Sequence, residues 1–121
     1  DKEGNLTEEE PAAPQTAFSA QTAATIRGMM AKVVEEGTGQ SALPAYGGAG
    51  GKTGTAETGW VQSDKAVVQS WFAGYYPEEE PRYVMAVIAE DTNNTGSKAA
   101  PVFKQICDKI YELEQSRANA S

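Results

Sequence analysis

Residues 47–60 read GGAGGKTGTAETGW, and the interpretation of the whole chain depends on this stretch. A glycine-rich run that leads into Lys-Thr is typical of two different sites. One is a loop whose backbone N–H groups cradle a phosphate. The other is a β-strand at the edge of a sheet, where Lys and Thr side chains line an anion-binding cleft. The surrounding sequence separates the two.

The spacing and the neighbouring elements both disfavour a nucleotide-binding loop. The phosphate loop G-x-x-x-x-G-K-[ST] would end at residues 51–53 and would need glycine at position 46, which holds Tyr46. Such a loop also follows a strand and opens a helix, whose N-terminus helps to hold the phosphates. Here the run follows a predicted helix and opens a predicted strand. The dinucleotide fingerprint G-x-G-x-x-G fails too, because its third glycine position holds Thr53.

Hydrophobic periodicity predicts an amphipathic helix before the glycine-rich run. The helix is expected over about 20–36, with Ser19 as its N-cap and Gly37 as its stop. Residues 37–51 contain six Gly and one Pro and are predicted to form a loop. The apolar face of the helix is expected to consist of Ala23, Ile26, Met30, Val33 and Val34.

Three stretches with short connections predict an antiparallel sheet. The first begins at Lys52 in the Thr-rich KTGTAET and is followed by a turn near 59–64. The second is KAVVQSWFAGYY (65–76), and the third, after a turn at 77–81, is RYVMAVIAE (82–90). The last two stretches are apolar on both faces, which predicts a sheet covered on both sides.

A second helix is predicted after the polar loop DTNNTGS. Ser97 is the expected N-cap, with Pro101 in the first turn. Cys107 is interpreted as a small buried hydrophobe, and the tail from Gln115 is expected to fray. The apolar stripe is expected to be Val102, Phe103, Ile106, Ile110 and Leu113.

This order of elements predicts an α+β fold of the α/β-sandwich type: a helix, a three-stranded antiparallel sheet and a C-terminal helix. The predicted organisation is a linker over 1–18, a folded segment over 19–114 and a flexible tail over 115–121. Two helices give little cover for a sheet that is apolar on both faces, and the chain has no initiator Met. The sequence therefore indicates a piece of a larger domain.

Composition argues against several classes of function. The net charge is −7 and no basic patch exists, so nucleic-acid binding is not expected. The chain contains no His, so Ser-His-Asp and Cys-His machinery cannot be assembled from it alone, and the commonest zinc ligand is missing. Neither a metal nor an organic cofactor is predicted. No stretch approaches the roughly 18 apolar residues that a membrane span requires.

The chemistry of an edge strand fits KTGT. Side chains alternate along a strand, so Lys52 and Gly54 are expected on one side and Thr53 and Thr55 on the other. Two hydroxyls, a free backbone N–H and a nearby ammonium group suit a carboxylate or an oxyanion. Gly54 removes side-chain bulk where a ligand would lie close to the strand.

Longer segments in the same order resemble one family. GGKTGTAETG, then QSWFAGYYPEEEPRYVMAVIAED, then AAPVFKQICDKIYE resemble the C-terminal part of the transpeptidase domain of penicillin-binding proteins. K-T-G is one of the signatures of that family. Ala-Glu after KTGT favours the class B, monofunctional type. The resemblance covers about residues 16–112 and implies part of a β-lactamase/transpeptidase-like domain.

The resemblance implies roles for four residues. Lys52 would supply positive potential and help to set the hydrogen-bond network around the nucleophile. The hydroxyls of Thr53 and Thr55 would hold the carboxylate of a substrate peptide or a β-lactam, and the Thr55 N–H would be an oxyanion donor. Gly54 would give clearance. The implied partners are the rest of the domain, peptidoglycan stem peptides and β-lactams, and the parent would sit outside the bacterial plasma membrane on an upstream anchor.

The family's other two motifs are absent. No Ser of this chain has Lys three residues later or Asn two residues later. Both motifs lie upstream in the family, so the chain is expected to form one wall of an active site and to be inactive alone. Two alternatives remain open besides the nucleotide binder: a serine β-lactamase or β-lactam sensor of the same fold, and a non-catalytic anion- or peptide-binding module.

Overall fold

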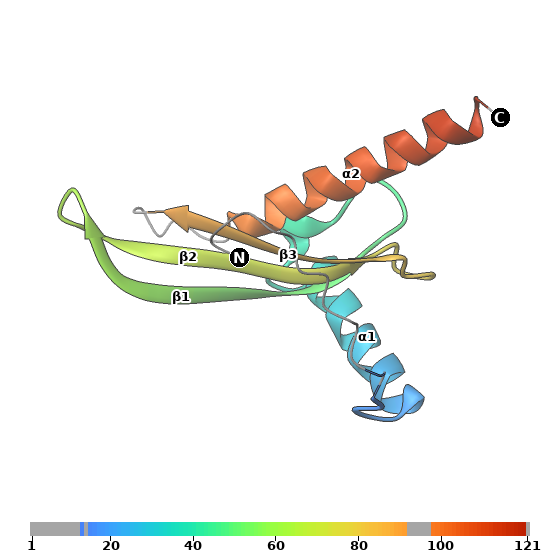
Figure 1. Ribbon diagram of the computed structural model, residues 1–121, viewed down its shortest axis with the longest axis horizontal. Helices are drawn as coiled ribbons and strands as arrows, with labels where there is room; N and C mark the ends of the chain where they lie inside the picture. The colour runs from blue at the N-terminus through green and yellow to red at the C-terminus, as the bar shows by residue number, and fades with distance from the viewer. Residues whose placement is uncertain (1–12, 14, 92–97, 121) are drawn as a thin grey trace, which may run out of the picture.

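The computed structural model describes residues 13, 15–91 and 98–120, and an antiparallel sheet lies at its centre (Figure 1). The strand order is β1-β2-β3, so β1 and β3 are the two edges of this sheet. The predicted α+β fold, with one helix before the sheet and one after it, is confirmed. The elements are α1 (Ala20–Glu35), the short 3₁₀ helix η1 (Gln40–Ala42), β1 (Gly50–Gln62), β2 (Lys65–Tyr76), β3 (Tyr83–Asp91) and α2 (Ala99–Ala118).

Helix α1 begins where the sequence predicts. The Ser19 side chain accepts a hydrogen bond from the Thr22 N–H and caps the first turn. Only Ala31 and Val34 of this helix are buried, and both lie in its C-terminal half. Figure 1 shows why, because the N-terminal half of α1 projects away from the sheet. The predicted helix is confirmed, but its apolar face contacts the rest of the chain mainly at its C-terminal end.

The glycine-rich run packs against aromatic rings. Strand β1 begins at Gly50, two residues earlier than the sequence predicts. A Cβ atom at Gly50 would collide with the Tyr75 ring, and one at Gly51 would collide with the Phe72 ring. These glycines therefore let two rings of β2 lie directly against the β1 backbone. Glycine at the start of β1 is needed for packing, and no phosphate has to be invoked to explain it.

The connection between β1 and β2 is tighter than predicted. The expected turn over 59–64 is mostly strand, because β1 continues through a register shift between Glu57 and Val61. Only Ser63 and Asp64 form the turn, with φ values of 52° and 63°. Strand β2 has the predicted bounds, and β3 begins one residue later than predicted.

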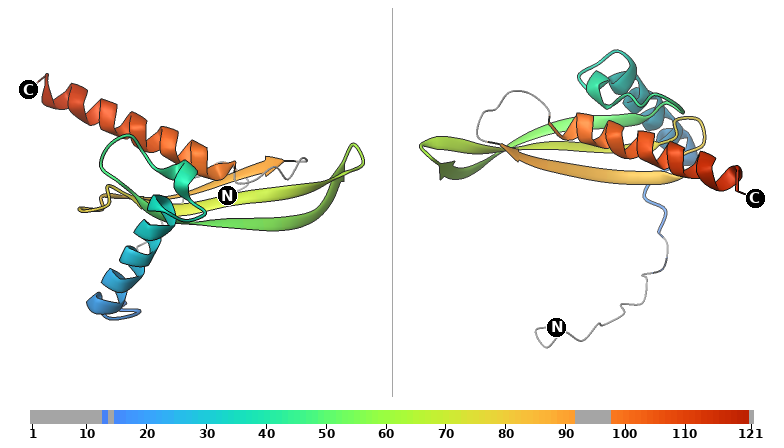
Figure 2. Two further views of the ribbon diagram at one scale, coloured as in Figure 1. Left: turned by 180° about the vertical axis from the view of Figure 1, so that it is seen from behind. Right: turned by 90° about the horizontal axis from the view of Figure 1, so that it is seen from above.

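One face of the sheet forms the core with α2. Helix α2 runs along this face in both views of Figure 2, and the rings of Phe72 and Phe103 lie 4.6 Å apart. The Ser70 hydroxyl accepts a hydrogen bond from the Ala99 N–H at 3.1 Å and so fixes the start of the helix. Cys107 is buried, and burial raises the pKa of its thiol to about 12. Its predicted role as a small buried hydrophobe is confirmed.

Only two of the five residues in the predicted apolar stripe of α2 face the core. Phe103 is buried and Ile110 packs against the core, but Val102, Ile106 and Leu113 are exposed. The stripe is wider than the contact that α2 makes with the sheet. The residues that the helix buries are Ala99, Ala100, Phe103 and Cys107.

The two ends of α2 are predicted from Ser97 and from the polar tail after residue 114. Ser97, the expected N-cap, lies outside the described residues, and the helix continues to Ala118. The expected linker over 1–18 lies largely outside the described residues as well. The predicted boundary between a folded segment that ends at residue 114 and a flexible tail that begins at residue 115 stays a prediction.

The opposite face of the sheet is largely bare. Val84, Ile88 and Trp71 share this face by register and alternation, and they are 87%, 50% and 37% exposed. Near the C-terminal end of β2, the Tyr75 hydroxyl donates a hydrogen bond to the Arg27 carbonyl of α1 at 2.8 Å. Within the part of the chain that the structure describes, the predicted cover of this second face is therefore limited to the end that contacts α1.

The segment that leads into β1 is fastened to α2. The Ala45 N–H donates to Asp108 Oδ1 at 2.7 Å, and Lys104 Nζ donates to Asp108 Oδ2 at 2.6 Å. The Tyr46 ring stacks on Tyr111 with centroids 4.4 Å apart. The hydrogen bond from Lys104, followed by that from the Ala45 N–H, holds the pKa of Asp108 below its ordinary value.

Two glycines of β1 are expected to respond differently to alanine. Gly51→Ala should lower the free energy of unfolding by about 1–3 kcal/mol, because the methyl group has no room beside Phe72. Gly54→Ala should change it by no more than about 0.5 kcal/mol, because the nearest atom to an added Cβ is Trp71 Cβ at 3.4 Å. Urea unfolding of both variants measures the difference, and equal effects would contradict this account of the glycine run.

The anchor at Asp108 predicts a pH dependence. Because folding lowers its pKa, the ionised carboxylate stabilises the fold fully above its unfolded pKa, and this contribution is lost as pH falls through the lower folded pKa. Asp108→Asn should lower the free energy of unfolding by about 1 kcal/mol at pH 7, and the difference should shrink below pH 3.8. Glu112→Gln is the control, since the Glu112 side chain forms an exposed ion pair with Lys109. A pH-independent difference would rule out the ionised anchor.

Candidate functional site

Strand β1 offers an open edge. It pairs with β2 on one side and has no strand on its other side among the described residues. Backbone N–H and C=O groups on an unpaired edge can bind a ligand. The predicted site residues 52–55 lie on this strand, close to the end of α1.

The two threonines of KTGT lie on the same face of the sheet as α2. Thr53 stands opposite Phe72 and Thr55 stands opposite Ser70, and both partners face the helix. Helix α2 packs on β2 and β3, so the threonines remain uncovered by it at the edge. Thr53 is half-buried and Thr55 is exposed.

Lys52 and Gly54 lie on the opposite face. Lys52 stands opposite Ala73 and Gly54 opposite Trp71, so the predicted alternation holds. Lys52 is exposed, and its ammonium group donates a hydrogen bond to the carbonyl oxygen of Thr53 at 2.9 Å. Packing does not require glycine at position 54, because only Trp71 Cβ lies near, at 3.4 Å.

A residue that the sequence did not single out joins this group. Thr38 lies in the turn that follows α1, and its hydroxyl oxygen lies 3.1 Å from that of Thr53. The only local signal is its position between Gly37 and Gly39 at the end of a predicted helix. Nothing in the sequence indicates that this hydroxyl meets β1, because the two threonines are 15 residues apart.

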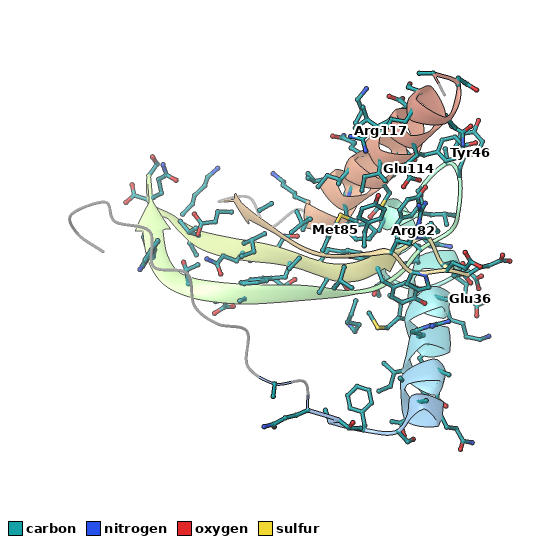
Figure 3. The ribbon with its side chains drawn as sticks, turned by 45° about the vertical axis from the view of Figure 1, so that its right-hand side comes forward. Glu36, Tyr46, Arg82, Met85, Glu114 and Arg117 are labelled. Atoms are coloured by element: carbon teal, nitrogen blue, oxygen red, sulfur yellow. The ribbon has the colours of Figure 1, made fainter. Side chains whose placement is uncertain are left out.

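A hollow of about 500 Å³ lies elsewhere, at the turn between β2 and β3. The Glu78 N–H donates to the Gly47 carbonyl at 2.8 Å and ties this turn to the glycine run. Arg82 forms an ion pair with Glu114 of α2 at 2.7 Å. Figure 3 labels both side chains, between the end of the sheet and α2. The predicted site residues do not line this hollow, whose walls are Gly47, Gly48, Pro77, Glu78, Glu79, Glu80 and Arg82.

Glu114 of α2, which lies near this turn, is bonded to protein groups. The Tyr83 hydroxyl donates to Glu114 at 2.9 Å, and this bond, followed by that from Arg82, lowers the pKa of Glu114. Across the residues that the structure describes, no group of three potential metal ligands comes together. No helix in the described ranges has the length and apolarity to cross a membrane.

Comparison with known proteins identifies the family to which the chain with this strand belongs. A sequence model of the family described as penicillin binding protein transpeptidase domain matches residues 1–108 of the 121. The chain belongs to the penicillin-binding protein transpeptidase family. The resemblance predicted from KTGT and the segments after it is confirmed, and the chain corresponds to the C-terminal part of such a transpeptidase domain.

Individual relatives support the same family assignment. Penicillin-binding protein PbpB of Mycolicibacterium smegmatis is 36% identical over 128 residues, which cover 91% of this chain and 19% of that protein. A peptidoglycan D,D-transpeptidase FtsI homolog of Chlorokybus atmophyticus is 29% identical over 106 residues, which cover 83% of this chain and 16% of that protein. The chain thus spans less than a fifth of these two curated relatives.

A solved transpeptidase domain has a similar backbone. The transpeptidase domain of the FtsI4 D,D-transpeptidase from Legionella pneumophila superposes with a TM-score of 0.64 at 31% identity. The superposition covers 77% of this chain and 37% of that chain. The penicillin-binding protein fold therefore extends over most of this chain, while the greater part of the solved domain has no counterpart in it.

Proposed function

We propose that the chain is the K-T-G wall of a serine D,D-transpeptidase of the class B penicillin-binding proteins, which cross-link peptidoglycan. The observation that carries this proposal is the open edge of β1, where Lys52, Thr53 and Thr55 present an ammonium group and two hydroxyls. These groups suit an anion that lies along the strand. The match to the penicillin-binding protein transpeptidase family supports the carboxylate of a peptide or a β-lactam as this anion.

Each residue of the strand takes a distinct role in this proposal. The hydroxyls of Thr53 and Thr55 bind the carboxylate of the substrate peptide or of a β-lactam. Lys52 provides positive potential beside the nucleophile and is placed in the catalytic machinery. Gly54 keeps the strand free of a side chain where the ligand passes, which agrees with the absence of a packing reason for glycine there.

The Thr55 N–H is proposed as one donor of the oxyanion hole. The Thr53 carbonyl accepts a hydrogen bond from Lys52, and backbone groups two residues apart along a strand point in the same direction. This supports placing the Thr55 N–H at the open edge. Losing one oxyanion donor costs on the order of 3 kcal/mol in the reaction barrier.

The nucleophile belongs to the remainder of the parent domain in this proposal. Neither Ser-x-x-Lys nor Ser-x-Asn occurs in the chain, so the chain alone is inactive. In the parent, serine attacks the carbonyl of a D-Ala-D-Ala stem peptide, the terminal D-Ala leaves, and an acyl-enzyme forms. An amine of a second peptide then displaces the serine and completes the cross-link. The parent is anchored in the bacterial plasma membrane in this proposal and works at its outer face.

The rest of the parent domain is also the proposed cover for the bare face of the sheet. Val84, Ile88 and Trp71 expose apolar surface on the side of Lys52. Burying such side chains stabilises a fold by about 1.5–3 kcal/mol each. We therefore place the segment with the nucleophile on this face.

A serine β-lactamase or β-lactam sensor of the same fold is the alternative. It would use the same edge strand, and it differs in the fate of the acyl-enzyme. Rapid turnover of a β-lactam by the parent would identify a hydrolase, whereas a lasting adduct supports the transpeptidase.

Labelling with a fluorescent penicillin tests the proposal. A longer polypeptide that includes the upstream motifs should become labelled, and the 121-residue chain should not. Lys52→Ala in the longer polypeptide should slow labelling by about tenfold to a hundredfold, because positive potential is lost beside the nucleophile. Lys109→Ala, an exposed lysine on α2, is the matched control. A folded longer polypeptide that takes no label would favour a non-catalytic anion- or peptide-binding module.

Two exposed valines test the proposed cover. In the longer polypeptide, Val84→Lys should lower the free energy of unfolding by about 2 kcal/mol or more, because it places a charge in a covered apolar face. Val61→Lys should change it by no more than about 0.5 kcal/mol, since Val61 is 69% exposed near the tip of the β1–β2 hairpin. Urea unfolding compares the two, and equal effects would mean that the bare face stays uncovered.

A further inference from the structure

The contact between Thr38 and Thr53 links the end of α1 to the proposed ligand edge. The two hydroxyl oxygens lie 3.1 Å apart, and either hydroxyl has the geometry to be the donor. Thr38 is exposed and Thr53 is half-buried. The bond therefore lies at the surface beside the open edge of β1, where a ligand would reach it.

The turn that carries Thr38 is held tightly. The Gly39 N–H donates to the Val33 carbonyl at 2.9 Å and closes the end of α1. A Cβ atom at Gly37 would lie 2.9 Å from Val33 Cα, and one at Gly39 would lie 3.0 Å from Val33 Cγ1. Neither flanking position has room for a side chain without a shift, so Thr38 stands in a backbone fixed on both sides.

The direction of the hydroxyl bond matters for an anion. A threonine hydroxyl has one hydrogen to donate and two lone pairs to accept with. If Thr53 donated to Thr38, it would turn a lone pair toward a carboxylate and repel it. If Thr38 donates to Thr53, the Thr53 hydrogen is free for the carboxylate, and the incoming bond strengthens it as a donor.

We propose that Thr38 is a positioning residue that orients the Thr53 hydroxyl to donate to a carboxylate at the edge of β1. The inference rests on the proposed function, because it assigns the ligand of Thr53 as a carboxylate. Thr38 acts through Thr53 and does not touch the reacting atoms. Its contribution is confined to ligands that carry the carboxylate.

The test compares two ligands on the longer polypeptide that includes the upstream motifs. The probes are benzylpenicillin and its methyl ester, which lacks the negative carboxylate. Thr38→Val should slow acylation by benzylpenicillin about tenfold, because the Thr53 hydroxyl is no longer oriented to donate to the charged carboxylate, and should leave the ester rate unchanged. Thr38→Ser should restore most of the benzylpenicillin rate, since it returns the hydroxyl. Thr25→Val is the control, because the Thr25 hydroxyl only bonds to the Gln21 carbonyl within α1.

A second variant separates this inference from the proposed function. If Thr53→Val reduces the preference for the carboxylate ligand and Thr38→Val does not, the role of Thr38 is overturned while the role of Thr53 stands. If Thr53→Val has no effect on that preference, both roles are overturned. Equal slowing of both ligands by Thr38→Val would mean that Thr38 only supports the fold, and would also overturn the proposal. A double variant no slower than Thr53→Val supports coupling through one bond.

Discussion

The packing of two β2 rings against bare glycine backbone at the start of β1 determines where the rest of the structure lies. Tyr75 and Phe72 occupy the space that side chains at Gly50 and Gly51 would need. This contact fixes the register of β1 on β2, because a shift by one residue would bring a side chain into a ring. Phe72 then meets Phe103 of α2 on the core face, so the same ring joins the edge strand to the helix.

The register also decides what the edge of β1 can do. With Thr53 opposite Phe72, both threonines fall on the α2 side of the sheet and Lys52 falls on the other. The strand thus presents hydroxyls on one side of its free edge and a cation on the other. Under the proposed function, an anion that lies along that edge would meet both kinds of group.

The exposed surfaces fit a segment of a larger domain. Apolar residues without cover among the described residues lie on one face of the sheet, in the N-terminal half of α1, and on α2 at Val102, Ile106 and Leu113. The family match and the small share of each relative that the chain spans agree with this picture. A surface of this kind explains why the sequence predicted more burial than the structure contains, because apolar patterning records contacts of the whole domain.

The sequence by itself determined the elements, their order and the family. Helical periodicity, β-branched runs and turn residues are local signals, and they placed α1, β2 and β3 within a residue or two of the observed bounds. Only the tertiary structure decided which residues of the α2 stripe are buried, since Val102 and Phe103 look equally apolar along the chain. Tertiary structure alone also brought Thr38 to Thr53, because hydroxyl contacts between residues far apart in the chain depend on how α1 and β1 pack.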